Sequence, residues 1–588
     1  MLLEKQNPAG LRLGPMRQLP LARAKFCCLV LLCILPGIST AQDLPPRPYI
    51  SANLMGPKQV TTQLLRGVTD YLNKGKLDEA AAIFREVLAN AEASGEQKAH
   101  AHYALGTVYH GQKSLDKAVA SFRTAARTKN ASSELAVLGH LGSSTVQYGR
   151  GNLEEALLDT GRAVEVPGAP VEVVALALMQ RAKFHEELGQ NDRAIEDCTL
   201  IIKEEALPWP PRATALAKRG ELYGKTGRPA DARADYTSVI SNKSSPVEPM
   251  PMALVNRSAL FMTAGKFEEG LADAQRAIVE FPTASPHTRA QALYNRAGCK
   301  LRLNDVKGAL EDYEAAATLP SALPATSAMA LIQKAEHFSR VNNHAAALAE
   351  TGRVEKLKNV PADLQCKALF FRAMAHVKLG RLPEAIENYT AVIKAREAPA
   401  ELMARALGDR GNVYKLLGKV EAAHEDYLKM AAVPGATPDQ RAMSKMRLGL
   451  LEEEVGKKEE AATHYAAAVA VPEVSDAKRA LAYQSEILLL MELKRTDEAL
   501  KSANALLEIT NLTAEQRCAG YGLRHQLYAK KGKVSETMAD LNALIAIPDA
   551  PANYKKMAFE ARAQLHDLLN QTSKAQDDRA MAIKIGAE

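Results

Sequence analysis

Aromatic residues are scarce in this sequence. They make up 5% of its 588 residues, with a single tryptophan, although 47% of the residues are hydrophobic. Alanine therefore carries much of the apolar content, and an alanine-rich chain with 24% charged residues favours closely packed helices over a fibrous or disordered chain. The tryptophan, Trp209, lies between Pro208 and Pro210, where we expect a connection in which the indole covers a loop.

An excess of charge of one sign is also lacking. The formal net charge is +7, and residues 1–41 carry +4 of it, from five basic residues against Glu4. Only +3 is left on the rest of the chain, far less than binding to a phosphate backbone requires. We therefore expect no nucleic-acid partner.

Catalytic and metal-binding signatures are absent too. The sequence has no P-loop, no GxSxG elbow, no HExxH pair, no glycine-rich dinucleotide turn and no CxxC. His100, His102 and His110 are close in sequence, but His100 and His110 would lie about 15 Å apart along one helix, so we expect surface histidines. The sequence predicts no enzyme, no cofactor and no metal.

Residues 1–41 resemble a signal peptide. Arg17, Arg23 and Lys25 precede an apolar run from Phe26 to Ile38, and small residues follow up to Ala41. The run is shorter than the roughly 20 residues that a membrane-spanning helix needs. We expect residues 1–41 to direct export to the periplasm or the extracellular space, with an uncleaved membrane anchor as the alternative. Residues 42–60 are rich in proline and predict an extended linker.

A small residue recurs through the rest of the chain with a regular spacing. Twelve of the thirteen intervals between these pivot positions are equal, and one is longer by a single position. The period is about 38 residues, which predicts a solenoid over residues 61–588. The pivots are Ala80, Ala118, Ala156, Ala194, Ala232, Gly270, Ala309, Ala347, Ala385, Ala423, Ala461, Ala499, Thr537 and Ala575.

Residues around each pivot define two helices and a turn. Five positions before the pivot, twelve of fourteen repeats carry Gly or Asn, which tolerate the left-handed conformation that ends many helices. Four positions after it, on the same helical face, half of the repeats carry Phe or Tyr, as in Phe122 and Tyr427. We therefore predict an all-α solenoid of about fourteen helix-turn-helix repeats.

These motifs resemble the tetratricopeptide repeat. The clearest examples are Leu105 to Tyr109 with Ala118 and Phe122, Arg219 to Tyr223 with Ala232 and Tyr236, and Arg410 to Tyr414 with Ala423 and Tyr427. The resemblance implies a right-handed superhelix whose first helices line a concave face and bind a protein or peptide. Because the usual unit has about 34 residues, we expect the extra turn of helix in the connection or at the start of the first helix.

A second pattern pairs opposite charges within a repeat. Arginine often stands thirteen positions before the pivot where aspartate stands three after it, which predicts partly buried ion pairs between the two helices of a repeat. The pairs are Arg181/Asp197, Arg219/Asp235, Arg257/Asp273, Arg296/Asp312, Arg410/Asp426, Arg524/Asp540 and Arg562/Asp578, with Lys334/Glu350 and Arg372/Asn388 as variants and Ser143/Asp159 lacking the cation.

The cysteines outside the leader fall in different repeats. Cys198, Cys299, Cys366 and Cys518 belong to repeats at least two apart, and helices that far apart exceed the roughly 7 Å that a disulfide can bridge. We expect four free thiols in packing positions.

The concave face implied by the resemblance would carry an apolar groove in the central repeats. Methionine adapts to varied shapes, so such a groove suits an amphipathic helix or an extended peptide. The predicted partner-binding residues are Met252, Val255, Met262, Tyr294, Leu301, Met329, Ile332, Phe370, Met374 and Val377. The alternative for each residue is packing between neighbouring helices.

The sequence thus favours a non-catalytic scaffold that binds a protein or peptide outside the cytosol. The lysine and asparagine pattern of the family's carboxylate clamp is missing, since Arg405, Asn412 and Lys415 match it only in part. Two alternatives stay open: a self-associating structural component of an envelope complex, and an enzyme built on the helices themselves.

Overall fold

The structure, a computed structural model, describes residues 54, 56–242 and 249–587. Within these ranges the chain forms helices and turns and no β-strand, so the predicted all-helical class is confirmed. The predicted signal peptide and most of the predicted linker lie outside the described residues.

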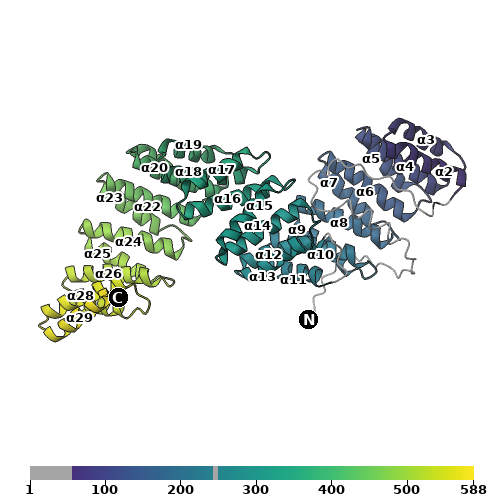
Figure 1. The fold of residues 1–588 in the computed structure, drawn as a ribbon. Coiled ribbons are helices and arrows are strands. Elements are labelled where there is room, and N and C mark those ends of the chain that lie inside the picture. The colour runs from purple at the N-terminus through teal and green to yellow at the C-terminus, as the bar shows by residue number, and fades with distance from the viewer. Residues whose placement is uncertain (1–53, 55, 243–248, 588) are drawn as a thin grey trace, which may run out of the picture. The chain divides into compact units, whose positions relative to one another are not determined.

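The chain divides into two compact units, Met1–Ala322 and Leu323–Glu588, and each consists of successive helix pairs (Figure 1). The first helices of the N-terminal unit are α2 (Lys58–Arg66, continued by η1, Gly67–Tyr71, and η2, Leu72–Lys74), α4 (Gly95–Gly111), α6 (Ser133–Gly149), α8 (Val171–Glu187), α10 (Trp209–Lys225), α12 (Pro249–Thr263) and α14 (Pro286–Arg302). Its second helices are α3 (Leu77–Ala89), α5 (Leu115–Arg127), α7 (Leu153–Val164), α9 (Asn191–Lys203), α11 (Pro229–Ser241), α13 (Phe267–Val279) and α15 (Val306–Thr318).

The C-terminal unit repeats this arrangement. Its first helices are α16 (Pro324–Arg340), α18 (Ala362–Lys378), α20 (Ala400–Leu416), α22 (Pro438–Glu454), α24 (Asp476–Glu492), α26 (Ala514–Lys530) and α28 (Ala552–Leu568). Its second helices are α17 (His344–Lys356), α19 (Leu382–Lys394), α21 (Val420–Ala432), α23 (Lys458–Val469), α25 (Thr496–Leu507), α27 (Val534–Ile545) and α29 (Thr572–Ala587).

The first helices are about one turn longer than the second helices. Most first helices have 17 residues, as α20 does, whereas most second helices have 13 or 12, as α21 and α27 do. The first helix is therefore the longest element of the repeat. The expectation of a loop at Trp209 is wrong, because α10 begins at this residue. Pro210 and Pro211 occupy the first turn of α10, where the backbone N–H groups have no partner within the helix, so that proline costs no hydrogen bond.

A left-handed residue ends the first helix of every repeat. All fourteen positions five before a pivot have φ between 58° and 84°, including Lys113 and Lys494, where neither Gly nor Asn is present. The next residue then donates its N–H to a carbonyl five positions earlier, as Arg228 does to Tyr223 at 2.8 Å. This bond satisfies the end of the first helix and sets the start of the second.

The pivots are buried where the two helices of a repeat touch. Ala232 and Ala423 are fully buried, and at the glycine pivot, Gly270, a Cβ would lie 3.2 Å from the Ser258 carbonyl oxygen of the first helix. The ring four positions later packs on a glycine of the first helix: a Cβ on Gly411 would lie 2.5 Å from Tyr427. In the repeats that carry such a ring, small residues on both helices thus make room for it.

Replacing Lys494 by glycine should stabilise the protein. A non-glycine residue in the left-handed region costs about 1 kcal/mol, and the Lys494 side chain is exposed. We expect Lys494→Gly to raise the free energy of opening of α24 and α25, measured by hydrogen exchange. The same change at Lys501, inside α25, should lower it, and equal effects of the two changes would contradict the explanation.

Candidate functional site

A row of bidentate ion pairs holds the first and second helices of the repeats in register. In all seven predicted Arg/Asp pairs, Nη2 lies 2.5–2.8 Å from one carboxylate oxygen of the aspartate. Nε of the same arginine also donates to the carboxylate, at 2.7 Å in Arg257/Asp273. The aspartate side chains are only 3–7% exposed, so these pairs are buried on the acidic side. The predicted ion pairs are confirmed.

Six of these arginines also reach back to the preceding repeat. Nη1 donates to a polar side chain on the preceding second helix, five positions after its pivot, at 2.5–3.0 Å. Each of the six therefore fastens its own hairpin and also the stacking of that hairpin on the one before. The sequence contains this signal, since the acceptor always stands at nearly the same distance before the arginine. The acceptors are Thr199, Thr237, Gln275, Thr390, Asn504 and Asn542.

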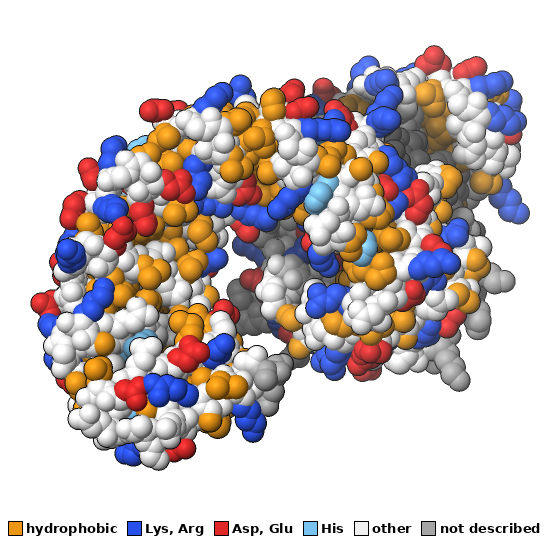
Figure 2. Space-filling view, turned by 60° about the vertical axis from the view of Figure 1, so that its left-hand side comes forward, with side chains coloured by type: hydrophobic (Ala, Val, Ile, Leu, Met, Phe, Trp, Pro, Cys, Tyr) orange, Lys and Arg blue, Asp and Glu red, His pale blue; other side chains and the backbone are white. Residues whose placement is uncertain are grey.

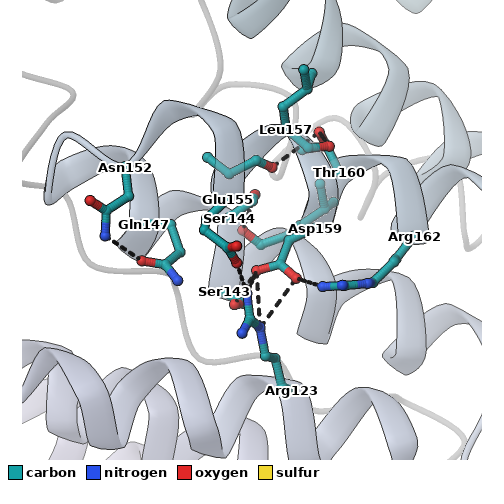
Figure 3. Close-up of polar contacts among 12 residues, drawn as sticks. Arg123, Ser143, Ser144, Gln147, Asn152, Glu155, Leu157, Asp159, Thr160 and Arg162 are labelled. Atoms are coloured by element: carbon teal, nitrogen blue, oxygen red, sulfur yellow. Dashed lines mark hydrogen bonds and ion pairs between the residues drawn. The ribbon is translucent and has the colours of Figure 1, made fainter.

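The third repeat is also bonded to the preceding repeat through an arginine and an aspartate, but here the arginine belongs to the preceding repeat (Figure 3). Ser143 occupies the usual arginine position and donates to Asp159 at 2.5 Å, while Arg123, from the second helix of the preceding repeat, binds Asp159 at 2.8 Å. Arg162 binds the other carboxylate oxygen of Asp159 at 2.7 Å. Asp159 is fully buried and keeps its charge compensated although its own repeat has no arginine on the first helix.

Two further repeats vary the pattern. Lys334 pairs with Glu350 at 2.7 Å, as predicted. Arg372 does not meet Asn388: it pairs with Glu355 of the preceding second helix, and Asn388 donates to the Glu384 carbonyl. Without an acid at position 388, the arginine takes the carboxylate that is within reach.

The protein should tolerate a double change that moves the arginine from position 123 to position 143. Arg123→Thr alone leaves Asp159 short of one cation, and breaking a buried pair costs about 3 kcal/mol. Adding Ser143→Arg recreates the arrangement of Arg219 and Thr199. We expect hydrogen exchange of α6 and α7 to be faster in the single variant and close to wild type in the double variant. A double variant that is less stable than the single variant would show that an arginine at position 143 cannot replace Arg123.

The first helices expose a surface on the side turned away from their second helices. Consecutive first helices contact one another within each unit, for example α4 with α6 and α20 with α22. The positions eighteen, eleven and seven before the pivot share one face, since these spacings are close to whole helical turns. Side chains at these positions are exposed or half-buried throughout the C-terminal unit, whereas His100, Leu138 and Leu176 of the N-terminal unit are buried. In α18 the three positions are Lys367, Met374 and Lys378. We call this surface the inner face of each unit.

The predicted partner-binding residues divide into two groups. Val255, Ile332 and Phe370 are only 1–2% exposed, so these three pack between helices and the prediction that they contact a partner is wrong. All three stand fifteen positions before a pivot, a position that faces the neighbouring helices. The other seven are partly exposed and stay predictions: Met252, Met262, Tyr294 and Leu301 in the N-terminal unit, and Met329, Met374 and Val377 in the C-terminal unit.

Sequence reasoning missed several exposed apolar side chains of the inner face. Leu416 is 68% exposed at the end of α20, Leu450 is 45% exposed on α22, and Leu481 and Leu488 are 40% and 55% exposed on α24. Patches of hydrophobic side chains are visible between charged ones in the space-filling view (Figure 2). The signal was available, because Leu450 and Leu488 are one period apart and occupy the position of Met374. They lie outside the central repeats on which the prediction concentrated.

Some charges of the two inner faces are paired and others are not. In the N-terminal unit, Glu186 binds Lys218 at 2.6 Å and Lys225 at 2.5 Å, and, although burial acts to raise it, the pKa of Glu221 is lowered by Lys218 and Lys225. In the C-terminal unit, Lys367, Lys378 and Arg405 are exposed and form no ion pair with the described residues.

Beside these cations lies one carboxylate that is already paired. Asp409 of α20 binds Arg447 of α22 at 3.1 Å. Burial raises the pKa of Asp409, and both Arg447, which is bonded to it, and Arg405, which is not, oppose that shift. The guanidinium of Arg405 lies 4.7 Å from the centre of the buried Phe370 ring, with which it makes a cation–π contact. This part of the inner face therefore has spare positive charge.

The histidines do not form a metal site. Within the described ranges no group of three or more potential ligands could hold a metal ion. His100 is 1% exposed and lies 3.6 Å from Glu96, so the expectation of a surface histidine is wrong at that position. Glu96, in the first turn of α4, also accepts from Ser132, the residue before α6.

The four cysteines in the described residues are free and buried. Burial raises the pKa of the Cys198 thiol to about 12 and that of Cys299 to about 11. Because the thiolate is the reactive form, neither is poised for chemistry.

Alkylation should report this burial. We expect iodoacetamide at pH 8 to modify Cys198 and Cys299 slowly in the folded protein and rapidly after denaturation, followed by mass spectrometry of the peptides. Fast stoichiometric labelling of the folded chain would contradict the packing described.

Comparison with known protein families gives a match over the helix pairs of the repeats. The tetratricopeptide repeat family model matches residues 65–134, 217–286, 260–324, 372–440 and 446–511, together more than half of the chain. No curated protein matches the chain. Within the described ranges, no helix has the length and hydrophobicity needed to span a membrane.

Solved structures similar to the chain share little sequence with it. The APC/C hetero-tetramer Cut9-Hcn1 is 14% identical and covers 85% of this chain and 96% of its own, with a TM-score of 0.31. Apo NprR from B. thuringiensis is 15% identical over 75% of this chain and 99% of its own, with a TM-score of 0.36. Apo RapI is 11% identical over 57% and 98%, with a TM-score of 0.39. The family assignment depends on the repeat match instead: the chain belongs to the tetratricopeptide repeat family.

Proposed function

We propose that this protein is a non-catalytic scaffold that binds a protein or peptide segment on the inner face of its C-terminal unit. The observation that carries the proposal is the exposure of Leu450, Leu481 and Leu488 on two neighbouring first helices. Exposed aliphatic side chains gathered on one face mark an interaction surface, because their burial against a partner removes apolar area from water. Repeats of this family bind proteins or peptides.

The scaffold is proposed to act outside the cytosol. The support is the sequence alone: a basic stretch, an apolar run from Phe26 to Ile38 and small residues up to Ala41. Cell fractionation, with the N-terminal residue of the purified protein determined by mass spectrometry, tests export and cleavage together. A protein retained in the cytosol with residues 1–41 intact would contradict both.

Replacing two of the leucines should abolish partner capture. We expect Leu450→Gln with Leu488→Gln to lose the partner that wild type retains in a cross-linked pull-down from the exported fraction. Glutamine is polar and similar in size to leucine, so the fold should persist. The matched control is Leu428→Gln on α21, a second helix, where the side chain is 49% exposed. Equal capture by the three proteins would contradict the proposed site.

Self-association is a second candidate, favoured by the last helix. Ile583 of α29 is 73% exposed, whereas the corresponding Ile545 is partly buried against Cys518, Leu541 and their neighbours. If α29 pairs with another copy, Ile583→Gln should convert an oligomer into a monomer in analytical ultracentrifugation. A wild-type monomer at high concentration would exclude this candidate.

A further inference from the structure

The inner face of the C-terminal unit is divided along its length into a cationic part and an aliphatic part. The cationic part has three exposed side chains, Lys367 and Lys378 on α18 and Arg405 on α20. The aliphatic part begins at the end of α20 and continues on α22 and α24, with Leu416, Leu450, Leu481 and Leu488. The two parts are therefore successive along four stacked first helices.

From this division we infer that the partner is an internal segment of a protein chain in which a group of acidic side chains adjoins a group of aliphatic ones. This inference rests on the proposed function and specifies the partner of the same site. The acidic half would lie over α18 and α20, and the aliphatic half over α22 and α24.

The cations are too far apart for one carboxylate. Lys367 and Lys378 are eleven residues apart on one helix, which is about 16 Å. Arg405 stands one period after Lys367, at the same place on the next first helix, and packed helices lie about 8–10 Å apart. A single chain-terminal carboxylate cannot reach all three, so their partner needs several Asp or Glu side chains.

Arg405 is the best placed of the three cations. Its guanidinium lies over the Phe370 ring at 4.7 Å, which restricts its orientation before any partner arrives. The acid one turn further along α20, Asp409, is bound to Arg447. Since no carboxylate among the described residues pairs with Arg405, its donors are available for a bidentate bond to a partner's carboxylate.

The aliphatic part argues against a polyphosphate such as RNA. Leu450 and Leu488 offer nothing to a phosphate backbone, and the adjacent Glu454 and Glu492 provide no spare cation. Each of these glutamates is already balanced by one lysine, Lys415 and Lys458 respectively. A peptide that changes from acidic to aliphatic along its length matches both parts.

The length of the segment follows from the helix spacing. Three intervals of about 8–10 Å separate α18 from α24, and an extended chain rises about 3.3 Å per residue. About eight or nine residues therefore span the four helices, with the acidic and aliphatic halves of similar length.

Selection from a phage-displayed library of random peptides, with the full chain as bait, tests the composition directly. We expect enriched peptides to carry Asp or Glu in one half and Leu, Ile or Val in the other half. Peptides made with both ends blocked should bind in fluorescence anisotropy, and Lys367→Glu with Arg405→Glu should weaken binding about tenfold. Lys394→Glu, an exposed position on the second helix α19, is the matched control and should have no effect.

Each of the other outcomes would contradict one stated part of the inference. Enriched peptides without acidic residues that still depend on Leu450 would refute the acidic segment and leave the proposed function intact. Binding only by peptides with a free C-terminus would assign the cations to a chain end instead. A labelled oligouridylate that binds wild type and is lost in the charge-reversed variant would replace the protein partner by a polyanion. If no peptide binds in a Leu450-dependent way, the proposed function fails as well.

Discussion

The stacking of the repeats depends on the hydrogen bonds that one arginine makes to three neighbouring acceptor atoms. In Arg219 the guanidinium binds both oxygens of Asp235 within the repeat and Thr199 in the preceding repeat. A hairpin of two helices cannot bury its apolar face alone, so it must stack in one register. A planar group with fixed donors sets that register more narrowly than apolar contacts do, because it tolerates only a small range of directions.

The ion pairs, the left-handed turns and the pivots fix most of each repeat, and they leave the inner face free to vary. None of the three needs the positions eighteen, eleven or seven before the pivot. Lys367, Arg405 and Leu481 occupy the same place in three repeats, and the two cations share no chemistry with the leucine. Differences of this kind cost the fold little, because exposed side chains away from packing features rarely change stability by more than about 0.5 kcal/mol.

Much of the architecture could be predicted from the sequence, since the period assigns every residue a place in its own hairpin. The pivots, the turns and the Arg/Asp pairs are all contacts within one repeat. Contacts between repeats are harder, because burial there depends on a neighbour whose side chains differ. Phe370 is buried under Arg405 of the next repeat. Glu96, four residues before the buried His100, accepts from Ser132 of the next repeat. Neither contact follows from the period. Leu450 was missed although its position in the repeat was known.

The third repeat shows which feature of the ion pairs matters. Its arginine has moved to the preceding second helix, yet Asp159 stays buried and doubly bound. Arg372 similarly finds Glu355 when its usual partner is absent. What persists is a compensated charge between two stacked hairpins, whichever residue supplies it, since an uncompensated charge at that depth costs several kcal/mol. A fold held by an exchangeable bond lets individual repeats change their sequence without losing register, and the inner face can then change one helix at a time.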